Sequence, residues 1–246
     1  EVPLAAPPAA GTFVADVHRA HGSQWYRDGV ESIRRLIETG GVYQVNLTDR
    51  VRSRLTAEPF DLYRSMVSGQ GGAFNAYLEL GPAVVASASP ELFLEIDGDT
   101  VVTRPMKGTA ARGITPEGDA ANATQLRNTP KERAENVMIV DLIRNDLSRV
   151  AQPHSVKVPR LFHLEALPTV WQMTSDVEAT TRPGTTLLDV FTALFPCGSI
   201  TGAPKVQAMR MIKTLEPAQR GVYCGAVGVV RPGGHATFNV AIRTVT

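Results

Sequence analysis

Two patterns of apolar and polar residues follow one another along this chain, and together they predict a mixture of helices and short strands. Apolar residues recur every three or four positions in several stretches, which is typical of amphipathic helices. These predicted helices span residues 24–39, 60–67, 186–194 and 204–215. β-Branched runs separated by turn signals such as Asp97-Gly98-Asp99 predict an antiparallel meander. The predicted strands span residues 42–55, 74–80, 83–89, 92–96, 100–103, 155–167, 169–177, 225–230 and 237–245.

The longest predicted helix, residues 129–150, carries apolar residues on nearly every face. Thr129 suits the N-cap, Pro130 the first helical position, and Glu132 completes a capping-box pattern. A helix that is apolar all round should be largely buried.

Charged residues on that same helix therefore need a partner or a ligand. Asp141 and Arg144 have the i,i+3 spacing of a structural ion pair. Glu132 has its capping role, whereas Glu135 has no such local role in the pattern.

Residues 42–55 alternate in polarity, so a strand there would have one apolar and one polar face. The polar face either meets solvent, which is usual for an antiparallel strand, or lines a ligand cavity. The residues of this polar face are Gln44, Asn46 and Thr48.

Lys107 occupies a distinctive place just after the predicted strand 100–103. Pro105 removes a backbone donor and Gly108 permits a sharp turn, so the lysine should sit at the tip of a rigid corner. It is either a solvated surface residue or a desolvated amine able to act as nucleophile or base. The following residues, up to 129, are rich in Gly, Thr, Ala, Asp and Asn and predict a loop.

Two later stretches carry further candidate chemistry. Residues 195–205 hold two glycines and several hydroxyls before a helix, and could arrange backbone N–H groups around an anion. They do not form a P-loop, because Lys205 does not directly follow Gly202. In the last predicted strand, Arg243 shares a face with Asn239 and Ala241.

Composition narrows the class of protein. The 246 residues are 43% hydrophobic and 20% charged, as expected of a soluble globular chain. Lys and Arg number 25 against 24 Asp and Glu, which gives no field to attract nucleic acid or an anionic membrane. No apolar run approaches the roughly 20 residues of a membrane span. Cys197 and Cys224 form neither a zinc pattern nor a disulfide framework, and they suit a cytoplasmic protein.

Five motifs, taken together, resemble the chorismate-utilising enzymes and occur in the order found in that family. They are Tyr43-Gln44-Val45-Asn46-Leu47, Ser89-Pro90-Glu91, Arg104-Pro105-Met106-Lys107-Gly108-Thr109, the stretch 134–146, and the stretch 198–205. The resemblance implies an α/β (α+β) fold like that of anthranilate synthase component I, with two packed antiparallel β-sheets and outer helices.

Within the family, two positions point to the large subunits of aminodeoxychorismate synthases. Anthranilate synthases typically have alanine at the position of Lys107, and isochorismate and salicylate synthases a lysine at the position of Gln44. The resemblance therefore implies that Lys107 attacks C2 of chorismate, that ammonia then adds at C4, and that the enolpyruvyl group is retained. Anthranilate or isochorismate synthase activity is the first alternative, and a catalytically silent chorismate-binding or interaction domain is the second.

The resemblance also implies roles for the remaining site residues. Glu91 corresponds to the general acid that protonates the departing C4 hydroxyl. Glu135 corresponds to a Mg²⁺ ligand, with Glu132 one turn before it. Chorismate would be bound by Gly108, Thr109, Gly198, Ser199, Gln44 and Arg243. Ammonia would come from a glutamine amidotransferase subunit.

The sequence departs from the family pattern in several places. Many members have histidine at Gln172 and tyrosine at Val229. Residues 1–12, rich in Ala and Pro, are expected to be a linker or the remnant of a further N-terminal region. Residues 13–246 are expected to form the chorismate-binding domain, without the C-terminal strand and helix that carry another metal-binding glutamate in the family.

Overall fold

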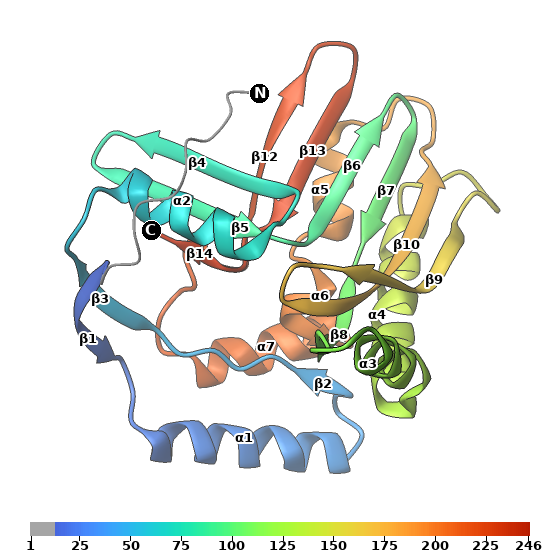
Figure 1. Cartoon of the computed structure of the whole chain (residues 1–246). Helices are drawn as coiled ribbons and strands as arrows, with labels where there is room; N and C mark the ends of the chain where they lie inside the picture. Colours follow the sequence, from blue (N-terminus) through green and yellow to red (C-terminus); the bar gives the residue numbers. More distant parts are fainter. Residues whose placement is uncertain (1–12) are drawn as a thin grey trace.

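The computed structural model describes residues 13–246, so the predicted linker of residues 1–12 lies outside the described residues. In that part of the chain the backbone forms antiparallel sheets with helices around them, as expected (Figure 1). Two larger sheets are accompanied by two short two-stranded ribbons.

The largest sheet has seven strands, and three of its six pairings join strands that are not consecutive in the sequence. In spatial order they are β12 (Ala226–Arg231), β13 (His235–Val240), β6 (Leu92–Asp97), β7 (Thr100–Arg104), β10 (Val170–Thr180) and β8 (Met106–Ala111), with β9 (Lys157–Ala166) paired to β10. The three-stranded sheet consists of β14 (Thr244–Val245), β5 (Ala83–Ser89) and β4 (Phe74–Leu80). The ribbons are β1 (Val14–Arg19) with β3 (Val51–Leu55), and β2 (Gln44–Val45) with β11 (Gly202–Ala203).

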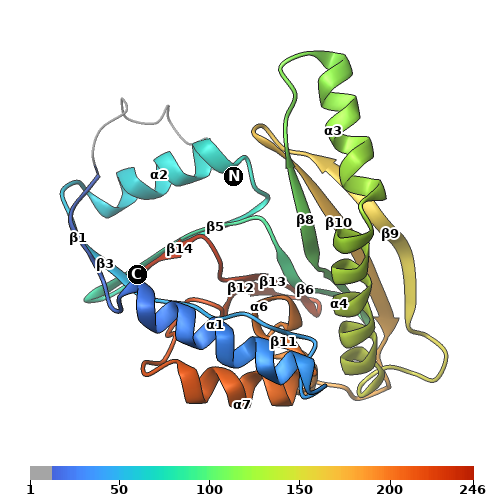
Figure 2. The same cartoon turned by 90° about the horizontal axis from the view of Figure 1, so that it is seen from below.

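Helices pack against the seven-stranded sheet, against the three-stranded sheet and against the β2–β11 ribbon. They are α1 (Ser23–Glu38), α2 (Pro59–Gln70), α3 (Pro116–Asn128), α4 (Pro130–Ser148), α5 (Leu187–Leu194), α6 (Gly198–Thr201) and α7 (Lys205–Leu215). Seen from below, α3 and α4 run along β8, β9 and β10 (Figure 2). None of the described helices is long and apolar enough to cross a membrane.

The main core lies between α4, α5 and the seven-stranded sheet. It is built from apolar side chains such as Leu94, Val101, Ile139, Leu147 and Val177, each completely buried. The prediction that α4 is largely buried is wrong, because its outer face carries charges and leaves side chains such as Val137 exposed.

The start of α4 differs from the predicted capping box in one respect. Thr129 is the N-cap as expected, but its side chain caps nothing. Instead Thr129 Oγ1 donates to the Gln125 carbonyl at 2.7 Å, because α3 ends at Thr129 and the same residue closes that helix.

Residues 107–129, predicted as a loop, instead contain strand β8 and helix α3. The sequence signal for α3 is its cap: Thr115 Oγ1 accepts a hydrogen bond from the Gly118 amide, and Pro116 stands at the first turn. The helix was hidden because Leu126 is its one fully buried apolar side chain, which leaves no periodic pattern to detect.

Pro105 does not send the chain into a corner. It separates β7 from β8, and both strands pair with successive halves of β10. The register shifts between Gln172 and Thr174, opposite Gly108, whose φ of +94° is accessible to glycine with little strain. Lys107 therefore projects from a bent strand and not from the tip of a loop.

Two strands predicted as continuous are interrupted. The run 42–55 divides into β2 and β3, because its halves pair with different partners, β11 and β1. The run 237–245 divides into β13 and β14, with Arg243 at the break in a left-handed conformation, φ +49°.

Candidate active site

Three of the predicted site residues converge although they come from different elements. Lys107 lies on β8, Glu91 between β5 and β6, and Ser199 on α6. Lys107 Nζ donates a hydrogen bond to the Ser199 carbonyl at 3.0 Å, and the lysine charge also acts on the Glu91 carboxyl. The lysine is half-buried, so its amine lies at the edge of the protein interior and is not freely solvated.

Glu91 is 3% exposed, and one of its oxygens, Oε1, has no hydrogen-bond partner among the described residues. Burial raises the pKa of Glu91 to about 7, although the Ser199 side chain, the Lys107 charge and the Met106 amide all act to lower it. A carboxyl with this pKa holds a proton near neutrality, which is the property required of a general acid.

The position of Glu91 is fixed through the neighbouring strand end. The Glu91 backbone amide donates to Ser89 Oγ at 3.2 Å, and the Ser89 hydroxyl donates to the Val240 carbonyl at 2.6 Å. The carboxyl is therefore held where β5, β6 and β13 meet.

The short helix α6 owes its place to two close approaches of glycine. A Cβ on Gly198 would lie 2.3 Å from Leu142 Cδ2, and one on Gly202 would lie 2.1 Å from the Gln44 carbonyl. A side chain at either position would push α6 away from α4 or from β2, and would move the Ser199 carbonyl with it.

The other side chains around α6 are structural. Lys205 Nζ lies 2.5 Å from Asp146 Oδ2 and donates to the Leu194 carbonyl at 2.8 Å, so this lysine has buried partners. Cys197 Sγ lies 3.2 Å from Ser199 Oγ. Burial raises the pKa of the Cys197 thiol to about 12, which keeps it protonated and unreactive.

The polar face of residues 44–48 points into the protein and not into solvent, and its side chains bond other described residues. Asn46 Nδ2 donates to the Ser199 carbonyl at 2.7 Å, the same carbonyl that accepts from Lys107. Gln44 Nε2 donates to Asn46 Oδ1 at 3.3 Å. Gln44 Oε1 is buried without a hydrogen-bond partner among the described residues.

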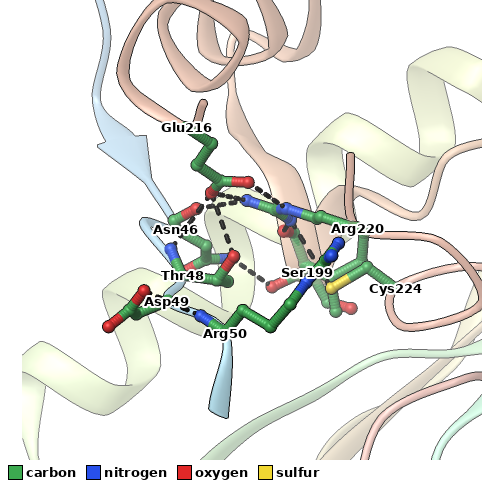
Figure 3. Close-up of polar contacts among 9 residues, drawn as sticks. Asn46, Thr48, Asp49, Arg50, Ser199, Glu216, Arg220 and Cys224 are labelled. Carbon is green, nitrogen blue, oxygen red and sulfur yellow. Dashed lines mark hydrogen bonds and ion pairs between the residues drawn. The ribbon is translucent and has the colours of Figure 1, made fainter. Parts of the chain in front are cut away.

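Behind Asn46 lies a buried ion pair that sequence reasoning missed (Figure 3). Arg220 donates through Nε and Nη2 to Glu216, at 2.9 and 2.7 Å. Its guanidinium also donates to the carbonyls of Ile200 at 2.8 Å and Asn46 at 2.7 Å. The i,i+4 spacing of Glu216 and Arg220 was the available signal, but the spacing alone does not distinguish a buried pair from a surface pair.

Gln172 replaces the histidine expected by resemblance, and it binds the residues that follow Lys107. Gln172 Nε2 donates to the Gly108 carbonyl at 2.8 Å, and Gln172 Oε1 accepts from Thr109 Oγ1 at 3.0 Å. The side chain is buried. An amide can make both bonds at once because it carries a donor and an acceptor, so Gln172 holds the Gly108 backbone and the Thr109 side chain in place.

The two predicted metal ligands lie one turn apart on α4. Glu132 Oε2 lies against Gly108, 3.1 Å from where a Cβ of that glycine would be. Glu135 Oε1 lies 3.9 Å from Lys131 Nζ, a helical neighbour that the sequence reading overlooked. No cluster of three or more acidic, His or Cys residues that could hold a metal occurs in residues 13–246. Carboxylate oxygens are ligands that Mg²⁺ accepts, so the two side chains have suitable chemistry, but by themselves they do not form a metal-holding cluster among these residues.

No hydrogen bond or ion pair among the described residues joins Arg243 or Val229 to this cluster. Arg243 is exposed and its guanidinium donates to Gln70 Oε1. The prediction that Arg243 shares a face with Asn239 and Ala241 is wrong, because the strand breaks after β13 and both of those residues are buried. Val229 is 45% exposed on β12.

A pocket of about 830 Å³ adjoins α6 and is bordered by the Glu216–Arg220 pair. Its apolar wall includes Phe195, Ile200, Met209, Ile212 and Tyr223. Ile200 is the neighbour of Ser199, so this pocket and the Lys107 cluster share α6 as a wall.

Comparison with known proteins gives a consistent result along nearly the whole chain. Residues 3–246 match the family model described as chorismate binding enzyme. Aminodeoxychorismate synthase component 1 of Klebsiella aerogenes is 40% identical over 241 residues, which are 97% of this chain and 53% of that protein. Anthranilate synthase component 1 of Streptomyces coelicolor is also 40% identical, over 97% of this chain and 48% of that protein.

A solved structure agrees with the fold. Anthranilate synthase component I from Streptococcus pneumoniae superposes with a TM-score of 0.86 at 33% identity, covering 95% of this chain and 51% of that one. The expected anthranilate synthase component I-like fold is therefore confirmed. The chain spans about half the length of the curated relatives it matches, and both kinds of synthase are equally similar to it.

Proposed function

From the premise that this chain belongs to the chorismate-binding enzyme family, we propose that it carries the active site of an aminodeoxychorismate synthase large subunit. Such an enzyme exchanges the C4 hydroxyl of chorismate for an amine and supplies 4-aminobenzoate and folate biosynthesis. The observation that carries the proposal is the half-buried Lys107 amine, 3.0 Å from the Ser199 carbonyl and close enough for its charge to act on the buried Glu91 carboxyl.

In the first step, deprotonated Lys107 Nζ forms a bond to C2 of chorismate while the two conjugated ring double bonds shift toward C4 and the C4–O bond breaks. Glu91 donates its proton to the departing hydroxyl, which leaves as water. In the second step, ammonia forms a bond to C4 as the bond from C2 to Nζ breaks. The surplus proton of the new ammonium returns to Glu91, so lysine and acid are both regenerated.

Substrate contacts are proposed for residues that border this cluster. Gly108 and Thr109 are held by Gln172, and Gly198 and Ser199 by the packing of α6. The unpartnered Gln44 Oε1 offers an acceptor for a substrate hydroxyl. Arg243 is proposed to bind the enolpyruvyl carboxylate, which requires its exposed guanidinium to leave Gln70.

Mg²⁺ is proposed to be held by Glu135 and Glu132. The ion would supply positive charge for a substrate carboxylate, while the two glutamates and water complete its oxygen shell. The position of Glu132 against Gly108 supports a metal site next to the substrate contacts.

Ammonia is proposed to come from a glutamine amidotransferase subunit. Relatives of both kinds carry the name component 1, which supports a two-component enzyme. The two cysteines are free, buried thiols, in keeping with a cytoplasmic location.

A product assay tests the proposal. The protein is incubated with chorismate, Mg²⁺ and an ammonium salt at mildly alkaline pH, and the products are identified by mass spectrometry. We expect 4-amino-4-deoxychorismate from the wild type and a loss of at least about 100-fold in Lys107→Ala, because the nucleophile is removed. Lys107→Arg should not restore activity, since guanidinium stays protonated.

Each other outcome would replace the proposal with a defined alternative. Anthranilate or isochorismate as product would assign the chain to another synthase and remove the nucleophilic role of Lys107. An unchanged yield from Lys107→Ala would exclude the covalent route. Binding of chorismate without any product, measured by calorimetry, would indicate a catalytically silent binding domain.

A further inference from the structure

The Ser199 carbonyl oxygen accepts two side-chain hydrogen bonds in the interior of the site. One comes from Lys107 Nζ at 3.0 Å and the other from Asn46 Nδ2 at 2.7 Å. Ser199 is 5% exposed, so solvent has little access to replace either donor. A carbonyl oxygen has two lone pairs, and here both are used.

Asn46 is itself held from two directions, so its amide cannot easily turn away. Gln44 Nε2 donates to Asn46 Oδ1 at 3.3 Å, which leaves the Asn46 amide nitrogen facing Ser199. Arg220 Nη2 donates to the Asn46 backbone carbonyl at 2.7 Å, and Glu216 balances the guanidinium charge (Figure 3). The amide is therefore preorganised by neighbours that do not touch Lys107.

This arrangement affects the freedom of the lysine. When Lys107 Nζ moves from the Ser199 carbonyl toward a substrate carbon, a buried acceptor would lose its partner, which is costly. The Asn46 amide remains on the same oxygen and keeps it satisfied. Because the Ser199 carbonyl oxygen also accepts a hydrogen bond from Asn46, it is a weaker acceptor for Lys107.

We propose that Asn46 is a positioning residue that shares the Ser199 carbonyl with Lys107 and thereby releases the lysine amine for attack. The catalytic consequence of this inference rests on the proposed function. The reactivity of the Lys107 amine does not, because it can be measured on the protein without chorismate. No direct contact between Asn46 and the substrate is needed.

The test compares three variants. Asn46→Leu removes the donor at similar size, and Asn46→Asp replaces the donor by an acceptor. Thr48→Val is the matched control, because Thr48 lies on the same polar face and its hydroxyl bonds Glu216 at 3.1 Å without touching Ser199. The Thr48 backbone bond to Glu216, at 3.0 Å, is retained in that control.

Two readouts are measured on each folded variant. In steady-state assays we expect kcat for Asn46→Leu to fall about 10- to 100-fold, the value of one buried hydrogen bond, while KM for chorismate changes less than about threefold. Carbamoylation of Lys107 by cyanate, followed by peptide mass spectrometry, should slow by a similar factor in the absence of substrate. Asn46→Asp should slow it further, because a carboxylate would hold the ammonium form.

The outcomes separate this inference from the proposed function. If the wild type makes no aminodeoxychorismate but Lys107 carbamoylation still slows in both Asn46 variants, the proposed function fails and the positioning role stands. Equal carbamoylation rates in wild type, Asn46→Leu and Thr48→Val would overturn the positioning role whatever the product. A loss equal in Thr48→Val and Asn46→Leu would assign the effect to the strand as a whole and would also overturn it.

Discussion

Two polar clusters flank strand β8, and they differ in how deeply they are buried and in how completely their hydrogen bonds are made. At one end, Lys107, Glu91 and Gln44 leave two buried oxygens, Glu91 Oε1 and Gln44 Oε1, without partners among the described residues. At the other end, Arg112 and Asp119 form a two-pronged ion pair at 2.6 and 2.8 Å.

The second cluster, which we call the Arg112–Asp119 pin, is saturated. Asp119 Oδ1 also accepts from the Gly113 amide and from Trp171 Nε1, both at 2.8 Å. The Arg112 guanidinium lies 4.8 Å from the centre of the Trp171 ring. Hydrogen bonds from Arg112 and Gly113 hold the pKa of Asp119 well below its usual range.

The contrast in pKa shows what each cluster is suited to do. The Asp119 carboxylate, which accepts hydrogen bonds from Arg112, Gly113 and Trp171, is stabilised in its charged form and fastens α3 to the sheet. An incompletely satisfied, buried carboxyl is kept protonated, which costs stability when it ionises but retains a proton for chemistry. Both clusters lie beside strand β8, one at each of its ends, so the difference arises from the groups packed around each carboxyl.

The largest effect is expected from Glu91→Gln. The amide keeps the shape of the side chain but cannot donate an acidic proton, so turnover of chorismate should fall by about 10²- to 10⁴-fold. The variant should remain folded, because it removes a group whose ionised form is penalised. Initial rates with ammonium salt and thermal unfolding at pH 8 measure the two effects. Undiminished turnover would contradict the acid role.

The pH dependence of stability should also separate the clusters. The unfolded chain releases the Glu91 proton near pH 4.5, whereas the folded protein holds it until about 7. The folded state binds more protons in that window, so Glu91 should lower stability progressively as pH rises from 4.5 to 7, by roughly 3 kcal/mol in all.

Urea unfolding of wild type and Glu91→Gln across pH 4–9 measures that contribution. The difference between the two curves should grow between pH 4.5 and 7 and stay level above. Asp119 should affect stability in the opposite direction, because folding lowers its pKa. Its contribution stabilises the folded state at pH values above the pKa of the unfolded chain, and that contribution is lost as pH falls. Curves that run parallel from pH 4.5 to 8 would mean that Glu91 ionises normally.

The smallest effect is expected from Trp171→Phe, which removes one donor from the pin. The lost hydrogen bond to a charged acceptor should destabilise the fold by about 1–2 kcal/mol, seen as a lower urea midpoint. kcat per folded molecule should change less than about threefold, because Trp171 does not touch Lys107 or Glu91. A large loss of kcat with unchanged stability would show that the pin belongs to the active site.

The sequence pattern was sufficient to predict those helices and strands whose signal lies in a few neighbouring residues. Caps and 3.6-residue periodicity located helices such as α1, α4 and α5, and β-branched runs located β4 to β7 and the β9–β10 hairpin. Family motifs identified Lys107 and Glu91 because their chemistry depends on residue type, and the structure brings both to one place.

The sequence failed where partners decide the local structure. Helix α3 has one buried apolar residue, so its face cannot be detected from hydrophobicity. The run 237–245 alternates like a single strand, but its two ends pair in different sheets, β13 with β6 and β14 with β5. Arg243 takes a left-handed conformation at the join, which the pattern does not encode.

The sequence itself therefore determined most of the element order and the residue types on which the proposed lysine–glutamate chemistry depends. Only the tertiary structure decided which donors meet at the Ser199 carbonyl, since Lys107 and Asn46 reach it from 92 and 153 positions away. Propensity and periodicity act over a few residues. The pKa of a buried group depends on every element packed around it, and those elements come together only when the chain folds.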